Sequence, residues 1–176
     1  MKSIVVYRSK TGFTKKYAEW IAEELGSDIF AVSQVNAAML TAYDTVIYGG
    51  GLYAGGINGV KIITNNMAKL QGKKIVVFAT GASPMREEVI SEVRDRNFTL
   101  EQQEKIQFFY LRGGFNYTKL QFGDKILMQL LKWTLKRKKE LTPDDKGMLA
   151  AYDTPVDFAK RQNIDDLIAY VKNKLQ

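Results

Sequence analysis

Five short apolar runs recur along the chain, and longer amphipathic stretches separate them. The runs are rich in Val, Ile, Phe and Tyr without regular polar alternation, which is typical of parallel strands buried on both faces of a sheet. Because strands and helices alternate, the pattern predicts an α/β fold with a doubly wound, five-stranded parallel sheet and helices on both faces. The runs occupy residues 4–7, 29–32, 44–50, 74–80 and 106–111.

Helical spacing fills the intervals between these runs. After Phe13, apolar side chains recur every three or four residues, and Gly26 offers the left-handed conformation that closes many helices. Similar stretches predict helices near 59–70, 86–104 and 164–175. We expect the strand order 2-1-3-4-5, in which the ligand crevice lies at the carboxyl ends of the first and third strands.

The bend between the first strand and the first helix carries the strongest chemical signal. It combines three hydroxyl groups, a glycine for the turn and the unpaired amides of a helix N-terminus, which together predict a seat for an anion. The alternative is ordinary helix capping by Thr11 or Thr14, which requires one hydroxyl and leaves the other two and Gly12 unexplained. The residues of the bend are Ser9, Lys10, Thr11, Gly12, Phe13 and Thr14.

The loops expected after the third and fourth strands are also built mainly from small residues. Glycines there would let the backbone approach a flat ligand, against which Leu52 and Tyr53 could pack. A glycine pair at 113–114 follows the fifth strand, and the aromatic residues Phe115 and Tyr117 after it are candidate walls for a planar ligand. Each loop alone is compatible with a tight turn, but three such loops at one sheet edge indicate a binding site. The expected lining residues are Gly50, Gly51, Leu52, Tyr53, Ala54 and Gly55 in one loop, and Thr80, Gly81, Ala82 and Ser83 in the other.

Composition narrows the chemistry, because the 176 residues include no cysteine and no histidine. Disulfides, thiolate metal sites, cysteine nucleophiles and imidazole catalysis are excluded, and we expect no metal. Any reaction would depend on carboxylates, Tyr, Lys or a bound cofactor, and we assign no catalytic residue. The net charge of +7 favours an anionic partner, although nucleic acid is disfavoured because the basic residues are dispersed outside 136–139.

The pattern Ser9-x-Thr11-Gly12-x-Thr14 between a first strand and a first helix resembles the phosphate loop of flavodoxins. The resemblance covers essentially the whole chain, and it implies a flavodoxin-like fold with FMN as the cofactor. By this resemblance, residues 9–14 would bind the phosphate of FMN. Residues 50–55 would lie along one side of the isoalloxazine, and residues 80–83 would form the other wall.

Residues 112–155 make a longer connection than a minimal flavodoxin has, and we treat residues 1–176 as one domain that carries this insert. The insert opens with Gly-Gly-Phe-Asn-Tyr, continues with a helical stretch that contains Asp-Lys-Ile-Leu-Met, and reaches Tyr-Asp-Thr before the last helix. These features resemble the menaquinone-dependent protoporphyrinogen oxidases, which share the flavodoxin-like fold.

A basic amphipathic helix is expected at residues 123–139 of the insert. On a helical projection its lysines collect on one stripe, whereas its apolar residues spread over about 220°. One packing face cannot bury so wide an arc. The helix is therefore either wedged between the body and the insert, or it exposes an apolar surface to a membrane or a partner.

The function that these features favour is that of an FMN-dependent oxidoreductase, which transfers electrons between a reduced substrate and a quinone-like or protein acceptor. The alternative is a flavodoxin-type electron carrier without a substrate of its own, with an acidic redox partner protein because the chain is basic. Without a leader or a membrane-spanning apolar run, we expect a cytoplasmic protein, peripheral at the membrane if the 123–139 helix binds lipid.

Overall fold

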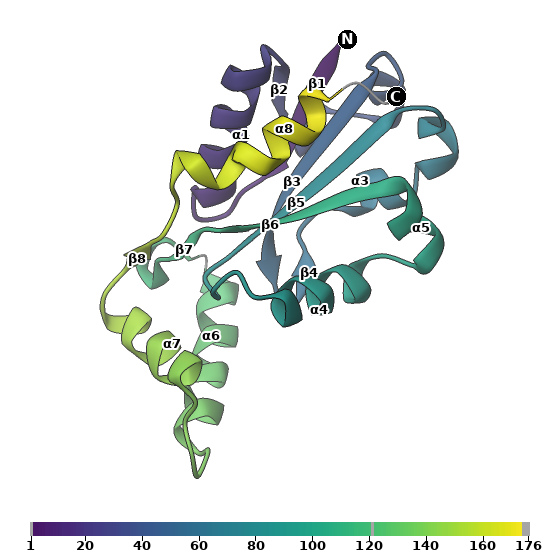
Figure 1. The fold of residues 1–176 in the computed structure, drawn as a ribbon. Coiled ribbons are helices and arrows are strands. Elements are labelled where there is room, and N and C mark those ends of the chain that lie inside the picture. Colours follow the sequence, from purple (N-terminus) through teal and green to yellow (C-terminus); the bar gives the residue numbers. More distant parts are fainter. Residues whose placement is uncertain (1, 121, 174–176) are drawn as a thin grey trace.

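A parallel sheet with helices on both faces forms the body of the protein (Figure 1). The computed structural model describes residues 2–120 and 122–173, with side chains for all of these except residues 119, 122, 127 and 144. The parallel strands are β1 (Ser3–Arg8), β2 (Asp28–Ala31), β3 (Thr45–Tyr53), β5 (Lys74–Gly81) and β6 (Ile106–Arg112). Their order, β2-β1-β3-β5-β6, confirms the predicted order 2-1-3-4-5.

The apolar runs are continuous because both faces of the sheet are covered. In the strand register Val5 pairs with Ile47 and Ile47 with Val76, and all three pack beneath two helices on one face. Val6 and Val77 belong to the core on the opposite face. The first face is covered by α1 (Phe13–Leu25) and α8 (Asp165–Lys172), and the second by α2 (Ala37–Leu40), α3 (Lys61–Thr64) and α4 (Glu87–Asn97).

The first helix forms as its sequence predicts. Its N-cap residue is Gly12 and its C-cap residue is Gly26, with φ angles of 98° and 60°, and both lie in the left-handed region that glycine tolerates best. The last helix, expected at 164–175, runs over Asp165–Lys172, and the part of that prediction beyond residue 173 lies outside the described residues.

The prediction of one helix at 86–104 is wrong. Phe98 is buried in an extended conformation after α4, and a new helix, α5 (Leu100–Lys105), begins at Thr99. Thr99 and Gln102 form a reciprocal capping box, which starts a helix rather than continuing one. The prediction of a continuous helix at 59–70 is also wrong. There, Asn66 Nδ2 donates to the carbonyl of Ile62, and a short 3-10 turn, Met67–Leu70, follows α3.

The glycine-rich stretch at 49–56 is mainly a strand, which corrects the loop expected there. The third strand continues to Tyr53 and returns antiparallel through β4 (Gly56–Ile57). A Cβ on Gly49 would collide with the ring of Phe78, and a Cβ on Gly50 would lie 2.6 Å from the side chain of Ile57. These two glycines therefore make room for neighbouring side chains of the protein and not for a ligand.

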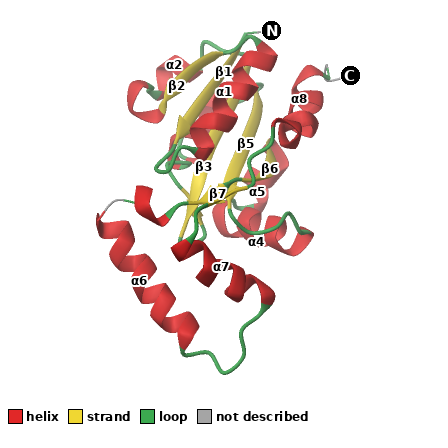
Figure 2. Cartoon of the chain, turned by 90° about the vertical axis from the view of Figure 1, so that its left-hand side faces the viewer, coloured by secondary structure: helices red, strands yellow, loops and turns green. Residues whose placement is uncertain are grey.

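The insert folds into a helical hairpin that projects beyond the carboxyl ends of the sheet (Figures 1 and 2). Its base is a two-stranded ribbon, and the predicted 123–139 helix ends earlier than expected, at Lys136. The second helix was missed although Thr142 caps it and Pro143 begins it. In the described part of the chain no helix is both long and apolar enough to cross a bilayer. The elements are β7 (Gly114–Phe115), α6 (Phe122–Lys136), α7 (Pro143–Asp153) and β8 (Val156–Asp157).

Candidate functional site

The carboxyl ends of β1, β3 and β5 bring the three predicted segments to one cavity of about 280 Å³. Segments separated by dozens of residues meet there because parallel strands end at the same edge of a sheet. Of the sixteen residues predicted for the site, twelve line this cavity. They are Lys10, Thr11, Phe13, Thr14, Gly51, Leu52, Tyr53, Ala54, Thr80, Gly81, Ala82 and Ser83.

The other four predicted residues do not line the cavity. Ser9 and Gly12 belong to the bend and shape it, since Ser9 Oγ accepts the backbone N–H of Gly12 at 3.1 Å. Gly50 is buried within the sheet. Gly55 lies against α4, where a Cβ would lie 2.6 Å from the guanidinium of Arg96. These four residues shape the backbone around the cavity without lining it.

The N-terminus of α1 faces the site without a side-chain cap from any of the described residues. Neither Thr11 nor Thr14 caps the first turn, so ordinary capping does not account for the hydroxyls of the bend. The first amides of a helix have no partner within the helix, and the helix dipole adds positive potential at this end. The bend therefore presents backbone donors that suit an anion.

Thr14 has a different environment from the one its place in the bend suggests. Its side chain is buried, and its Oγ1 lies 2.7 Å from the Oγ1 of Thr80, so that a hydrogen bond joins α1 to the end of β5. A Cβ on Gly51 would lie 3.3 Å from the same Thr14 oxygen. The two hydroxyls and Gly51 thus form one wall of the cavity where all three segments touch.

Lys10 links the bend to the insert. Its Nζ donates to both carboxylate oxygens of Asp124 in the first turn of α6, at 2.7 and 2.9 Å. The same Nζ lies 4.0 Å from the ring centroid of Tyr53. Because the side chain of Asp124 is 7% exposed, this ion pair is better shielded from solvent than the surface pairs of the body.

Side chains of the hairpin cover one side of the cavity, a feature that was not predicted from the sequence. Met128, Leu131 and Met148 line the cavity from α6 and α7. Asp124, Met128 and Leu131 are spaced so that they share one face of a helix, which could have indicated an inward-facing side. Because apolar residues spread over a wide arc of this helix, the inward-facing side did not stand out in the sequence. Gly114 and Phe115, expected at this edge after the fifth strand, also line the cavity, whereas Tyr117 does not. Asn58, Tyr110, Leu120 and Asp124 are further lining residues that were not predicted.

Tyr110 in β6 holds the loop after β5 in place. Its hydroxyl donates to the backbone oxygen of Ser83 at 3.0 Å, and burial raises the pKa of the Tyr110 phenol to about 12. The phenol is therefore neutral near pH 7 and acts as a hydrogen-bond donor. This contact positions the segment that forms the second predicted wall.

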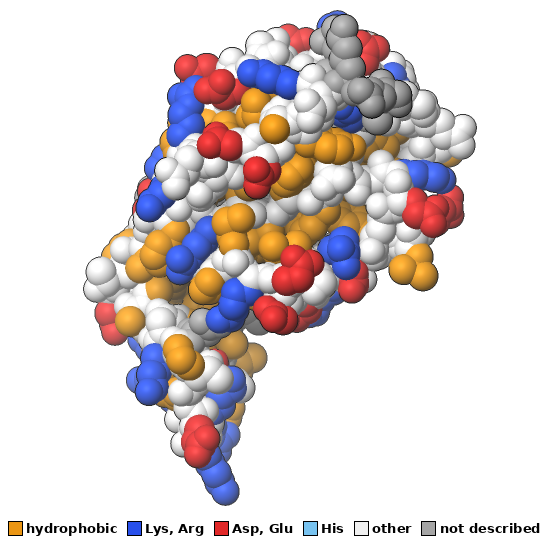
Figure 3. Space-filling view, viewed as in Figure 1, with side chains coloured by type: hydrophobic (Ala, Val, Ile, Leu, Met, Phe, Trp, Pro, Cys, Tyr) orange, Lys and Arg blue, Asp and Glu red, His pale blue; other side chains and the backbone are white. Residues whose placement is uncertain are grey.

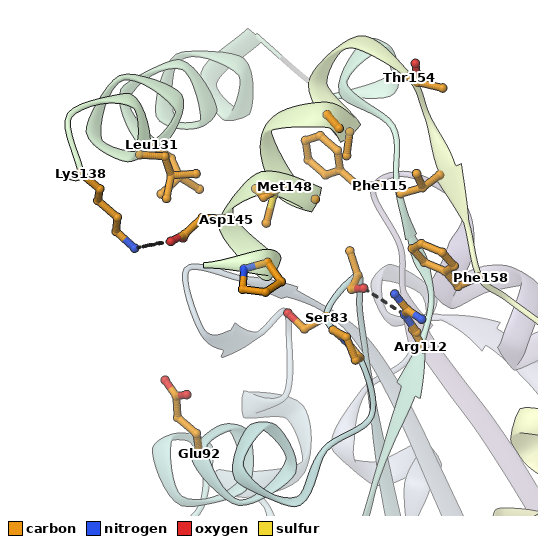
Figure 4. Close-up of a pocket in the computed structure, with 18 residues that line it drawn as sticks. Ser83, Glu92, Arg112, Phe115, Leu131, Lys138, Asp145, Met148, Thr154 and Phe158 are labelled. Carbon is orange, nitrogen blue, oxygen red and sulfur yellow. Dashed lines mark hydrogen bonds and ion pairs between the residues drawn. The ribbon is translucent and has the colours of Figure 1, made fainter. Parts of the chain in front are cut away.

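A larger cavity of about 1030 Å³ lies between the hairpin and the body (Figure 4). Five residues line both cavities, so the two are adjacent; they are Ala82, Ser83, Phe115, Leu131 and Met148. Figure 4 shows Lys138 and Asp145, whose ion pair is 3.0 Å long, at the end of the larger cavity farthest from the sheet. Its volume is at the upper end of the range for small-molecule sites.

Arg112 lies at the other end of the larger cavity, where β6 ends. Its Nε donates to the backbone oxygen of Ala82 at 3.2 Å, and its guanidinium carbon lies 3.7 Å from the ring centroid of Phe158. Stacking and hydrogen bonding fix the plane of the guanidinium, and part of its donor capacity is left for a ligand. A cation in a mainly apolar cavity suits a large molecule that carries an acidic group.

Comparisons with known proteins agree with this architecture. Residues 4–142 match a family model described as a flavodoxin domain. An uncharacterized protein of Methanocaldococcus jannaschii is 31% identical over 130 residues, which cover 66% of this chain and 85% of that protein.

Among solved structures, a flavodoxin, WrbA-like protein from Agrobacterium tumefaciens is similar at 21% identity, with a TM-score of 0.48, over 70% of this chain and 87% of that one. Oxidised flavodoxin 2 from Bacillus cereus is also similar at 21% identity, with a TM-score of 0.42, over 64% and 86% of the two chains. The matched family model spans most of the chain, including β1 to β6 and α6. The chain belongs to the flavodoxin-domain family.

Proposed function

We propose that the protein binds FMN in the 280 Å³ cavity and uses it to transfer electrons. The observation that carries this proposal is the convergence of the uncapped N-terminus of α1 with residues 51–54 and 80–83. A helix N-terminus suits the phosphate of FMN, and a gap between two backbone segments suits its flat ring. Membership of the flavodoxin-domain family supports the same assignment.

At the phosphate end, the donors would be the first backbone amides of α1 and the hydroxyl of Thr11, which lines the cavity. Lys10 is already engaged by Asp124, so phosphate binding would not depend on its charge. The hydrogen bond from the Gly12 amide to Ser9 would keep the bend in the conformation that exposes the remaining donors.

At the ring end, Leu52 and Tyr53 would lie along one side of the isoalloxazine, and Ala82 and Ser83 along the other. Lys10 covers the Tyr53 ring, which orients it at the edge of the cavity. Met128, Leu131 and Met148 would exclude water from the remaining side. FMN, when bound, would supply the redox chemistry that a chain without cysteine and histidine otherwise lacks.

The larger cavity favours an enzyme over a pure electron carrier. An electron carrier needs an exposed edge for a protein partner and has no use for an adjacent cavity of about 1030 Å³. An extended ring molecule such as a quinone or a porphyrinogen would fit its volume and its apolar lining. Arg112 would attract a carboxylate of a porphyrinogen or of another acidic substrate. The residues shared by the two cavities would separate such a molecule from the flavin by one layer.

The flavin assignment can be tested by absorbance. Protein mixed with excess FMN and then desalted should retain flavin absorbance in the visible region. A Thr11→Asp variant should lose it, because a carboxylate would occupy the place of the phosphate, whereas the uncharged Thr11→Asn control should retain most of it. A folded wild-type protein that stays colourless would overturn the proposal.

A turnover assay separates the enzyme from the carrier. The FMN-loaded protein should reduce an added soluble quinone in the presence of a chemical reductant. A Met148→Trp substitution, which fills the wall between the cavities, should slow this turnover by at least about tenfold, whereas Leu100→Trp on the exposed face of α5 should not. Rapid electron exchange with a protein partner, without quinone turnover, would favour the carrier instead.

A further inference from the structure

The outward face of α6 carries an apolar ridge. Ile126, Leu130 and Trp133 are 59%, 58% and 55% exposed, and their spacing aligns them along one side of the helix. The opposite side holds the buried residues Asp124 and Leu135. The apolar arc that the sequence contains is thus divided between a face that packs on the protein and a ridge that faces solvent.

Basic residues flank and end this ridge. The guanidinium of Arg137 stacks 4.1 Å from the ring centroid of Trp133. At 100° per residue, Lys125 and Lys136 lie beside the ridge, whereas Lys132 between them is paired with Asp153 of α7 at 3.7 Å. Between residues 123 and 140 the chain has six basic residues and two acidic ones, one of which, Asp124, faces inward to Lys10. Figure 3 shows basic and hydrophobic side chains next to one another on the projecting hairpin.

We propose that the α6 ridge binds the surface of a bilayer that contains anionic lipids. Ile126, Leu130 and Trp133 would enter the boundary between headgroups and acyl chains, with the axis of α6 lying in the membrane plane. Lys125, Lys136 and Arg137 would remain at the level of the headgroup phosphates. The hairpin extends beyond the sheet, so the ridge can reach a flat surface without obstruction by the body (Figure 2).

Shape and charge favour a bilayer over other occupants. Two copies paired ridge to ridge would bring together the basic residues that flank both ridges, and like charges oppose such a contact. A soluble acidic protein would need a groove complementary to a convex ridge, whereas a fluid bilayer adapts to it. The combination of Trp, Leu and Ile with flanking cations is typical of helices that bind at membrane interfaces.

The test uses the fluorescence of Trp133. In a Trp20→Phe background, Trp133 is the one remaining tryptophan of the chain. Vesicles of equal parts phosphatidylcholine and phosphatidylglycerol should shift its emission to shorter wavelength and sediment the protein, whereas pure phosphatidylcholine should do so more weakly. Leu130→Ser should raise the apparent dissociation constant at least about tenfold, and Lys125→Gln/Lys136→Gln should reduce the preference for anionic vesicles.

Matched controls lie on the body. Leu100 in α5 is 81% exposed, so Leu100→Ser makes the same chemical change away from the ridge and should leave vesicle binding unchanged. Lys61→Gln/Lys69→Gln removes the same charge elsewhere and should have a smaller effect than the hairpin pair. The proposal is overturned if the wild type ignores anionic vesicles or if Leu100→Ser weakens binding as much as Leu130→Ser. Equal affinity for soluble polyglutamate, unaffected by Leu130→Ser, would also overturn it and indicate an acidic protein partner.

Discussion

Gly50 and Gly51 are adjacent in β3 but face different surroundings. A Cβ on Gly50 would lie 2.6 Å from Ile57 and 2.7 Å from the backbone oxygen of Asn58, both within the protein. A Cβ on Gly51 would meet the Thr14 hydroxyl at 3.3 Å, at the wall of the 280 Å³ cavity. Gly50 therefore makes room for neighbouring parts of the fold, whereas Gly51 borders the cavity.

Alanine at these two positions should therefore have separable effects. Gly50→Ala should lower the free energy of unfolding by about 1–3 kcal/mol through overpacking. Gly51→Ala should cost less stability but weaken FMN binding, because the methyl group enters the wall of the cavity. Urea denaturation and FMN titration of both variants provide the comparison, and equal stability losses without any effect of Gly51→Ala on FMN would contradict the assignment.

The raised pKa of Tyr110 predicts that the free energy of unfolding falls at alkaline pH. Burial raises the pKa of its phenol from near 10 to about 12, so the folded state holds this proton more tightly than the unfolded state. The stabilisation is complete below pH 10 and declines between pH 10 and 12, by at most about 1.4 kcal/mol per pH unit for one group. Burial also raises the pKa of Tyr48, which acts in the same direction.

A Tyr110→Phe variant should show a shallower loss of stability from pH 9 to 11.5 in urea denaturation. It should also be less stable at pH 8 by about 1 kcal/mol, because the Ser83 carbonyl loses its donor. A variant whose pH dependence matches that of the wild type would show that Tyr110 does not titrate as proposed.

At the scale of elements, the ion pair between Lys10 and Asp124 connects the hairpin to the bend. Asp124→Asn keeps the shape of the side chain but removes its charge, and it leaves the partly buried Lys10 without its counter-ion. We expect amide exchange in α6 to accelerate by at least about tenfold while exchange in the sheet stays unchanged.

Asp153→Asn is the matched control for this prediction. Asp153 is paired with Lys132 at 3.7 Å, but its side chain is 80% exposed, and such pairs contribute little. Hydrogen exchange followed by mass spectrometry distinguishes the two variants. Equal exchange in α6 for Asp124→Asn and Asp153→Asn would contradict the role of the Lys10 contact.

Elements whose signal is local were predicted well. The strands and α1 follow from the pattern of apolar residues and from the glycine at the helix end. Both features can be read within a single short segment, without knowing its neighbours in the fold. The prediction of one helix at 86–104 was wrong because Thr99 and Gln102 start a new helix at a point where the apolar periodicity alone would continue the first one. The predicted end of β3 was too early. Gly49 is needed because the Phe78 ring of the adjacent strand leaves no room for a Cβ, and this contact cannot be read from one strand alone.

At the scale of the whole molecule, the fold places the predicted segments together, but the side of the cavity that the hairpin covers depends on long-range contacts. The pairing of Lys10 with Asp124 spans 114 positions, and no local pattern indicates it. Met128 and Leu131 could have been recognised as an inward face, but their position over the cavity depends on how the hairpin is oriented. The body and the insert therefore make one site that neither contains alone.

If the N-terminus of α1 holds the phosphate of a flavin, as proposed, the protein should distinguish FMN from riboflavin. The two molecules share the isoalloxazine and differ in the phosphate. We predict from fluorescence titration that FMN binds at least about tenfold more tightly than riboflavin, and that Thr11→Asp abolishes this difference while Thr11→Asn preserves most of it. Equal affinities for FMN and riboflavin, or no binding of either by the folded protein, would contradict the account.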